Sequence, residues 1–321
     1  MDGVFWFLHY YIVDMSVPNK TYKIIYIPEN LNADSVLEVV KKLNLFVASE
    51  EKDIVISFSH TEIAAPSGLT PLLCYLRYLP GIKDFRGIIV HTNNKETDNL
   101  IARMGFYNSL GLTDEFDWNK EDVKLFKELY CFNNSTPEKE VISVNEDIIY
   151  SFTKQSKNDN YKKALSWCIP ELVDNARTHS NSRECVLFAQ KFSRGDYTEF
   201  CIADCGVGIQ ETMGDADAVT AIKRCISQAK GIYSKGMGNG LYFTAELIKK
   251  DFSKRKSCLR IVSGDVMLKL ESGAEATVEK INTNWQGTIV TLTLSDTIKS
   301  SIEKIKGSEV VLTEDLPDFY C

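Results

Sequence analysis

The sequence predicts an α/β (α+β) fold in two successive parts, and three observations support this prediction. Short apolar strands alternate with amphipathic helical segments in the first part, a pattern typical of a partly parallel sheet. A polar and acidic stretch then interrupts the pattern at 113–142. The second part opens with a helix-rich stretch and continues with strands joined as hairpins. We therefore expect a small α/β domain at 1–112, a linker at 113–142, an α/β sandwich at 143–295 and a C-terminal tail at 296–321.

In the first part, strand and helix patterns follow one another regularly. An apolar segment at 5–13 is too short to span a bilayer, and we expect a first strand or a docked segment there. Capping residues at 32–34 precede the first helix, and Ser67 with Gly68 opens the second. Strands are expected at 22–27, 53–58 and 87–91, and helices at 35–46, 67–79 and 95–104.

The second part begins after a loop signal at 133–137. A turn at 193–196 joins two apolar strands, and similar patterns predict mostly antiparallel hairpins further on. Helices are expected within 145–180 and at 215–230 and 238–250, and strands at 184–192, 197–204, 257–263, 266–271 and 287–294.

Composition and charge narrow the functional classes. The net charge is −7, so the chain lacks the basic footprint of a sequence-independent nucleic-acid binder. Nine cysteines show no CxxC spacing and are accompanied by four histidines, so we expect free thiols in a reducing compartment. The N-terminal residues lack the basic region and cleavage site of a signal peptide. These observations predict a cytoplasmic protein with no membrane segment and no nucleic-acid partner.

The stretch 170–180 (PELVDNARTHS) contains two polar residues that suit a metal and water site. Glu171 and Asn175 are four residues apart, so on a helix both side chains point to one face, and His179 continues the stripe. An amide oxygen can ligate Mg²⁺ while a nearby carboxylate orients a water molecule. Taken alone, the pattern fits a polar surface stripe equally well.

Two glycine-rich segments follow, at 203–209 (ADCGVGI) and 236–241 (GMGNGL). In the first, Asp204 ends an apolar strand, where its carboxylate can accept a hydrogen bond from an amino group such as that of adenine. In the second, glycines open a predicted helix whose first N–H groups form an anion site. The second segment is neither a dinucleotide-binding fingerprint, because no strand directly precedes it, nor a P-loop, because GKS and GKT are absent. Each segment alone is a weak signal.

Taken in order, these segments resemble the GHKL ATPase superfamily, which includes gyrase, heat-shock chaperones, mismatch-repair ATPases, histidine kinases and anti-sigma-factor serine kinases. ELVDNARTH resembles the N box, ADCGVGI the G1 box and GMGNGL the G2 box. Gly287 and Thr288 in WQGTIVTLTL resemble the Gly-Thr pair that opens the family's final strand. The resemblance covers about 145–295 and implies a Bergerat-type α/β sandwich that binds ATP and Mg²⁺.

The resemblance implies a role for each matched residue. Glu171 is the expected general base, and Asn175 is the expected Mg²⁺ ligand. Asp204 is expected to hold the adenine amino group, with support from Thr288. The other matched residues are glycines that shape the base pocket (Gly206 and Gly208), glycines whose N–H groups face the phosphates (Gly236, Gly238 and Gly240), and Lys235, a phosphate contact at the end of an ATP lid over 210–235.

Residues 1–112 resemble a STAS-type domain. The matching features are the strand DIVISF, a loop that reaches Ser67 before a helix, and the late segment MGFYNSLGL. In STAS antagonists the loop usually reads Asp-Ser-Ser-Gly, whereas Ala65 and Pro66 occupy the first two places here. We therefore expect an interaction module for a protein partner rather than a loop regulated by phosphorylation.

Three functions remain open. Glu171 favours an ATPase whose cycle drives a conformational or partner switch, for instance in bacterial signalling or phage defence. The pattern of Glu171, Asn175 and His179 beside a STAS-like part fits a partner-switching serine kinase. A non-hydrolysing ATP-binding module is the third. A sensor histidine kinase is disfavoured because the predicted helix before Glu171 has no histidine, and a gyrase-like machine because little chain follows the sandwich. The oligomeric state stays open.

Overall fold

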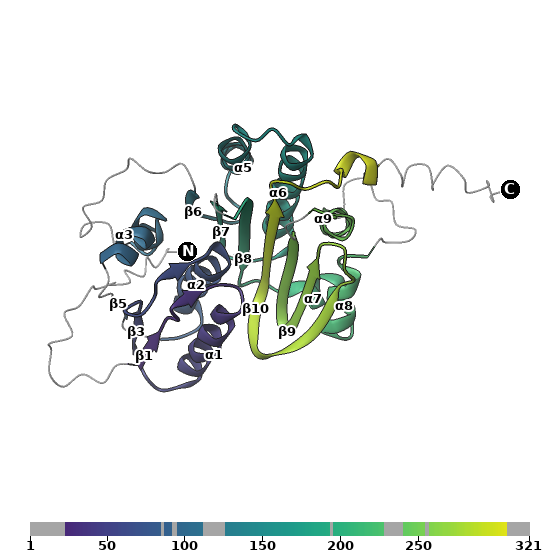
Figure 1. Ribbon diagram of the computed structural model, residues 1–321. Helices are drawn as coiled ribbons and strands as arrows, with labels where there is room; N and C mark the ends of the chain where they lie inside the picture. Colours follow the sequence, from purple (N-terminus) through teal and green to yellow (C-terminus); the bar gives the residue numbers. More distant parts are fainter. Residues whose placement is uncertain are drawn as a thin grey trace.

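The first part of the chain forms a parallel sheet with the order β1-β3-β5 (Figure 1). Each neighbouring pair is parallel and in continuous register, which confirms the predicted strand–helix alternation. The strands are β1 (Lys23–Tyr26), β3 (Asp53–Ser57) and β5 (Gly87–His91), and a second, short parallel pair is β2 (Asn30–Leu31) and β4 (Ile63–Ala64). The structure is a computed structural model that describes residues 23–84, 87–91, 95–111, 126–192, 195–227, 240–253 and 257–306.

The helices of the first part begin close to the predicted positions. They are α1 (Ser35–Ala48), α2 (Pro66–Tyr78), α3 (Lys95–Arg103) and α4 (Phe106–Ser109). Helix α2 starts one residue before Ser67, because Pro66 occupies the first helical turn, where its missing N–H is not needed. The apolar segment at 5–13 lies outside the described residues.

The second part is built on a five-stranded antiparallel sheet with the order β6-β7-β8-β10-β9. The mixed α/β class is therefore confirmed. The strands are β6 (Phe126–Phe132), β7 (Cys185–Phe192), β8 (Tyr197–Asp204), β9 (Cys258–Glu271) and β10 (Thr277–Ser295). Strand β9 is continuous where two strands were expected. Gly264, which has a positive φ of 63°, lies within the strand and pairs with Trp285 of β10 instead of closing a turn.

The segment 113–142, which the sequence presented as a linker, contributes structure to this sheet. Strand β6 lies inside it and pairs with β7, and Leu129 and Phe132 of β6 are buried. Helix α5 (Glu138–Thr153) also begins inside it. The sequence of β6 (FKELYCF) is mostly apolar, but the polar and acidic residues on both sides of it concealed the strand.

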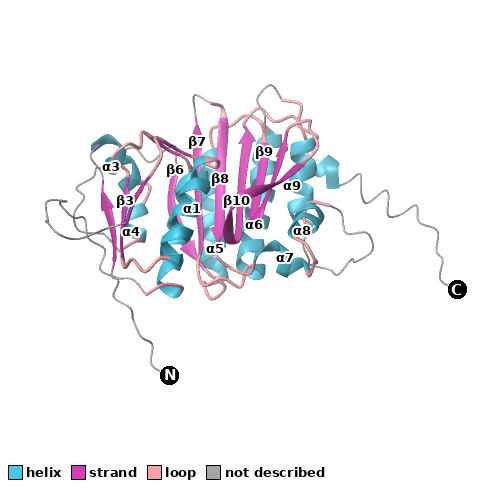
Figure 2. Ribbon diagram, turned by 90° about the horizontal axis from the view of Figure 1, so that it is seen from below, coloured by secondary structure: helices cyan, strands magenta, loops and turns pink. Residues whose placement is uncertain are grey.

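One face of the antiparallel sheet is covered by helices of the second part (Figure 2). Helices α6 (Asp159–His179) and α9 (Gly240–Lys249) pack against it and against each other, and α5 packs on α6. Two shorter helices are α7 (Gly208–Met213), which begins just before the predicted lid region 210–235, and α8 (Ala218–Arg224), which lies within it. Residues 228–235 of the predicted lid fall outside the described part of the chain.

The opposite face of the same sheet is covered by the first part of the chain. Helix α2 packs on β7 and β8, and α1 packs on β10. A single hydrophobic cluster joins buried residues of α1 and α2, such as Leu73, to sheet residues such as Phe188 and Trp285. The two parts therefore share a core, and the antiparallel sheet is buried on both faces.

Residues 296–306, predicted as the start of a tail, pack against α6 and α9. Ile298, Ile302 and Ile305 are buried in the second core cluster. The side-chain amide of Asn158 donates to the carbonyls of residues 296 and 298 at 2.9 Å each. The segment is therefore an integral part of the fold up to residue 306. Among the described helices, none is long and apolar enough to cross a membrane.

Candidate functional site

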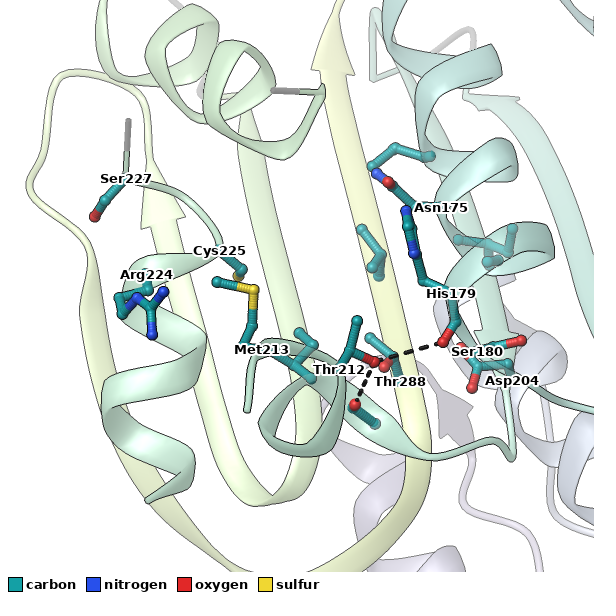
Figure 3. A pocket seen from close by; sticks show the side chains of 16 residues that line it. Asn175, His179, Ser180, Asp204, Thr212, Met213, Arg224, Cys225, Ser227 and Thr288 are labelled. Carbon is teal, nitrogen blue, oxygen red and sulfur yellow. Dashed lines mark hydrogen bonds between the residues drawn. The ribbon is translucent and has the colours of Figure 1, made fainter. Parts of the chain in front are cut away.

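A cavity of about 400 Å³ lies over β8 and β10, between α6 on one side and α7 and α8 on the other (Figure 3). Its walls combine apolar side chains with a few polar groups that point inward, as is common in ligand sites. The polar and glycine positions predicted from the sequence that line it are Asn175, His179, Asp204, Gly208 and Thr288.

Asp204 is the buried charge centre of this cavity. It ends β8, its neighbour across the ladder is Thr288 of β10, and it is 3% exposed. Burial raises the pKa of its carboxyl to about 7. Hydrogen bonds from the backbone of Gly206 and Thr288 lower this pKa, but their effect is smaller than that of burial. The Gly206 N–H donates to Oδ1 at 2.9 Å. In the part of the chain that the structure describes, no cation forms an ion pair with Asp204, so the carboxylate is available to a donor from a ligand.

Three residues of β10 clamp the loop that carries Asp204. The indole N–H of Trp285 donates to the backbone carbonyl of Asp204 at 2.9 Å. The side-chain amide of Gln286 donates to the backbone carbonyl of Gly206 at 2.6 Å. Gly287, with a φ of 103°, lies directly against Asp204 and leaves no room for a Cβ there. The ladder between β9 and β10 is irregular between Trp285 and Thr288, and such bulges commonly redirect side chains beside active sites.

Glu171 does not line the cavity but lies beside it. It is one turn from Asn175 on α6 and contacts the first residue of α9, since a Cβ on Gly240 would come within 2.6 Å of its Oε2. The side chain is half-buried. Desolvation raises the pKa of its carboxyl, Lys306 lowers it and Asp174 raises it further. The carboxylate is therefore more basic than an exposed glutamate and faces the N-terminus of α9.

The predicted residues fall into three groups. Asn175, Asp204, Gly208 and Thr288 meet at the cavity, Gly206 lies behind Asp204, and Glu171 and Gly240 form a contact beside it. Lys235, Gly236 and Gly238 lie outside the described residues.

Other lining residues belong to the predicted lid over 210–235, but the sequence did not single them out individually. Thr212 and Met213 come from α7, and Arg224 from α8. The Thr212 hydroxyl donates to the carbonyl of Gly208 at 2.8 Å, which fixes this side of the cavity. Their helical spacing was visible, but only the packing of α7 against the sheet directs them inward.

Gly206→Ala is expected to collapse the site. A Cβ at Gly206 would lie 1.9 Å from the backbone oxygen of Ser180, which itself accepts the Val207 N–H at 2.8 Å. Backbone cannot yield as a side chain can, so we expect a loss of about 1–3 kcal/mol or more in the free energy of unfolding. Urea denaturation measures it. Gly81→Ala is the control, since its Cβ would meet only Arg183 Nη1 at 3.8 Å. Equal stability of the two variants would contradict the packing described.

No protein-family model matches the chain, and no curated protein matches it either. We therefore infer the function from the chemistry of the residues that line the cavity.

Proposed function

We propose that the chain is a Bergerat-type, GHKL-like ATPase that binds Mg-ATP and acts as a nucleotide-dependent conformational or partner switch. The observation that carries this proposal is Asp204, a buried carboxylate without an ion-pair partner in the described residues, at the floor of a 400 Å³ cavity that Asn175 also lines. The antiparallel sheet with α6 and α9 packed on one face supports a Bergerat-type sandwich.

The cavity suits an adenine base. Ile202, Ile209 and Met213 give it apolar walls, against which a flat aromatic ring can pack. The ionised carboxylate of Asp204 accepts hydrogen bonds only, so it selects a ligand with an amino group at that point. Thr288 lies beside Asp204 in the ladder and offers a hydroxyl to the same edge of the base.

The residues also suit a magnesium ion that arrives with the nucleotide. Asn175 lines the cavity, and its side-chain amide carries one oxygen that can ligate a cation. Mg²⁺ is commonly held by one or two protein ligands, while substrate phosphates and waters fill the other positions. When bound, the ion would neutralise phosphate charge. The N-terminus of α9, which begins at Gly240, offers backbone N–H groups for the phosphates.

Glu171 is placed to accept the proton of an attacking water. It lies at the junction of α6 with the first residue of α9, where terminal phosphates would be held. The raised pKa of its carboxyl makes the ionised form a stronger base. Transfer of the phosphoryl group to water yields ADP and phosphate, and the change in bound nucleotide would then alter the positions of α7 and α8.

Glu171→Gln is expected to retain ATP binding while phosphate release falls by about 10²-fold or more, because the amide accepts no proton. Asn175→Ala is expected to weaken Mg-dependent ATP binding itself. Phosphate release and equilibrium binding should be measured for both variants. Glu146→Gln, an exposed change on α5, is the control and should leave both unchanged. Full phosphate release from Glu171→Gln would exclude the ATPase mechanism proposed.

The same assay separates the alternatives. Label from γ-³²P-ATP that appears on a protein serine, without phosphate release, would indicate the serine kinase, and ATP binding with neither signal would indicate the binding module. The STAS-like loop bears on this choice. Ser67 is 2% exposed, and its N–H donates to Oε1 of Glu199 on β8 at 2.8 Å, so this serine faces the chain's own sheet. We therefore favour a switch in which the first part senses the state of the second.

A further inference from the structure

The segment after β10 carries a lysine to the outer side of the proposed site. Lys306 Nζ lies over the ring of Trp167 on α6, 4.6 Å from its centroid, and 5.7 Å from the ring centroid of Phe243 on α9. The two rings meet edge to face, with centroids 5.4 Å apart. The electron-rich face of an aromatic ring attracts a cation within about 6 Å of the ring centroid, and both distances fall inside that range.

Helix periodicity places this ring pair beside Glu171. Trp167 and Glu171 are four residues apart on α6, and Gly240 and Phe243 are three apart on α9, so the members of each pair share a helix face. The ring contact therefore lies about one turn along both helices from the contact between Glu171 and Gly240, and one turn is about 5.4 Å. From its place over the ring pair, the Lys306 ammonium acts on the Glu171 carboxylate through its charge, about one helical turn away.

Among the charges around Glu171, the lysine has a distinct effect on the pKa of the Glu171 carboxyl. Burial raises the pKa of the Glu171 carboxyl, the charge of Lys306 lowers it, and Asp174 on the same helix raises it. The neighbouring thiol of Cys168 is fully buried and its pKa is raised to about 12, so it stays neutral near pH 7. Among the described residues that act on Glu171, Lys306 is the one that favours its ionised form.

The position of Lys306 is held by the packing of its segment. Ile302 and Ile305 are buried in the core beneath it. Glu303 pairs with Lys163 of α6 at 2.8 Å, and the Ser300 hydroxyl donates to the Leu247 carbonyl of α9 at 2.8 Å. The segment thus ties together the two helices that carry the Glu171 and Gly240 contact.

We propose that Lys306 is a positioning residue of the ATPase site, which the C-terminal segment holds across α6 and α9 so that Glu171 stays ionised and ready to accept a proton. This rests on the proposed function. In this role Lys306 acts through Glu171 and not on the nucleotide itself. It makes residues 296–306 part of the catalytic unit.

The test compares Lys306→Met, which keeps the apolar stem, with Lys306→Arg, which keeps the charge. Lys306→Met should lower kcat several-fold on the acidic limb of the pH profile, converge with the wild type at high pH, and leave the KM for ATP unchanged. Lys306→Arg should restore the wild-type profile. Lys304→Met, an exposed lysine of the same segment, is the control. Superimposable profiles of wild type and Lys306→Met would overturn the proposal.

A second readout works without turnover. The ¹³C carboxyl signal of Glu171, identified by its absence in Glu171→Gln, can be titrated in the nucleotide-free protein. In Lys306→Met it should titrate at a higher pH than in the wild type, and an unchanged titration would overturn the proposal. A wild type that releases no phosphate, but shows this difference, would reject the ATPase function while retaining the electrostatic effect of Lys306 on Glu171.

Discussion

Asp204→Asn is expected to stabilise the ligand-free protein at pH 8 and to weaken ATP binding at the same time. Burial raises the pKa of Asp204 to about 7 from an ordinary 3.8, so the folded protein binds its proton more tightly than the unfolded chain does. That contribution to stability is complete below about pH 4 and is lost as the pH rises through 7. Above pH 7 the buried charge is a cost of at most a few kcal/mol, which the neutral amide avoids.

The measurement is urea denaturation of both proteins at pH 5 and pH 8. The variant should gain stability relative to the wild type at pH 8 and gain less at pH 5. Asp251→Asn is a contrasting control. Its buried carboxylate accepts hydrogen bonds from Ser253, Ser257, Ser272 and the backbone of Lys299, so its loss should destabilise the protein. A loss of stability in Asp204→Asn at pH 8 would show that the carboxylate is a structural group.

Binding should change in the opposite direction. A hydrogen bond to a charged group contributes about 1.5–3 kcal/mol, so Asp204→Asn should weaken ATP binding by roughly 10- to 100-fold. In the wild type, affinity should fall as the pH drops from 8 to 6, since protonation removes the anionic acceptor. Calorimetric titration with ATP at both pH values tests this. If the affinity for ATP depends neither on pH nor on this substitution, Asp204 does not bind the adenine base. A residue that costs stability and is needed for binding is the usual signature of a functional site.

The local elements of this fold could be predicted well from the sequence. Alternation and helical spacing are properties of neighbouring residues, so most strands and helices lie close to their expected positions. The exceptions include β6, which lies in the predicted linker, β9, which was expected as two strands, and β10, which begins ten residues before the expected strand. Motif order was equally informative. Asn175, Asp204 and Thr288 come from three distant segments, and the structure brings them to one cavity.

The packing between distant segments could not be predicted in the same way. Ser67 meets Glu199 across 132 positions of sequence, and Lys306 lies over Trp167. Neither contact leaves a local pattern. One signal was present, however. The start of β7 (CVLFA) and the end of β8 (FCIAD) are buried at every position, and such unbroken apolar runs indicate a sheet covered on both faces.

Separate expression of the two parts should fail, because they share one core. Phe188, Val262, Trp285 and Ile289 of the antiparallel sheet belong to the same cluster as Leu73 of α2. Burying one such side chain contributes roughly 1.5–3 kcal/mol, so exposing four of them would cost on the order of 10 kcal/mol. That is comparable with the entire stability of a typical protein, about 5–15 kcal/mol. A fragment that begins at 126 should therefore aggregate or bind hydrophobic dyes, and its ATP site should be lost.

A variant that is cleaved after folding distinguishes loss of the shared core from poor expression of the fragments. A protease site inserted within 112–125 leaves the elements that build both sheets intact. After folding and cleavage, the two fragments should elute together from gel filtration, bind ATP as before, and separate only when urea unfolds them both in one transition. If the cleaved halves separate in buffer and the second half alone still binds ATP, they are independent domains. Joint unfolding would instead mean that the first part stabilises the antiparallel sheet from the face opposite α6 and α9. On that face, Trp285 couples α2 to the loop of Asp204 through its ring contact with Tyr75 and its hydrogen bond to the Asp204 carbonyl.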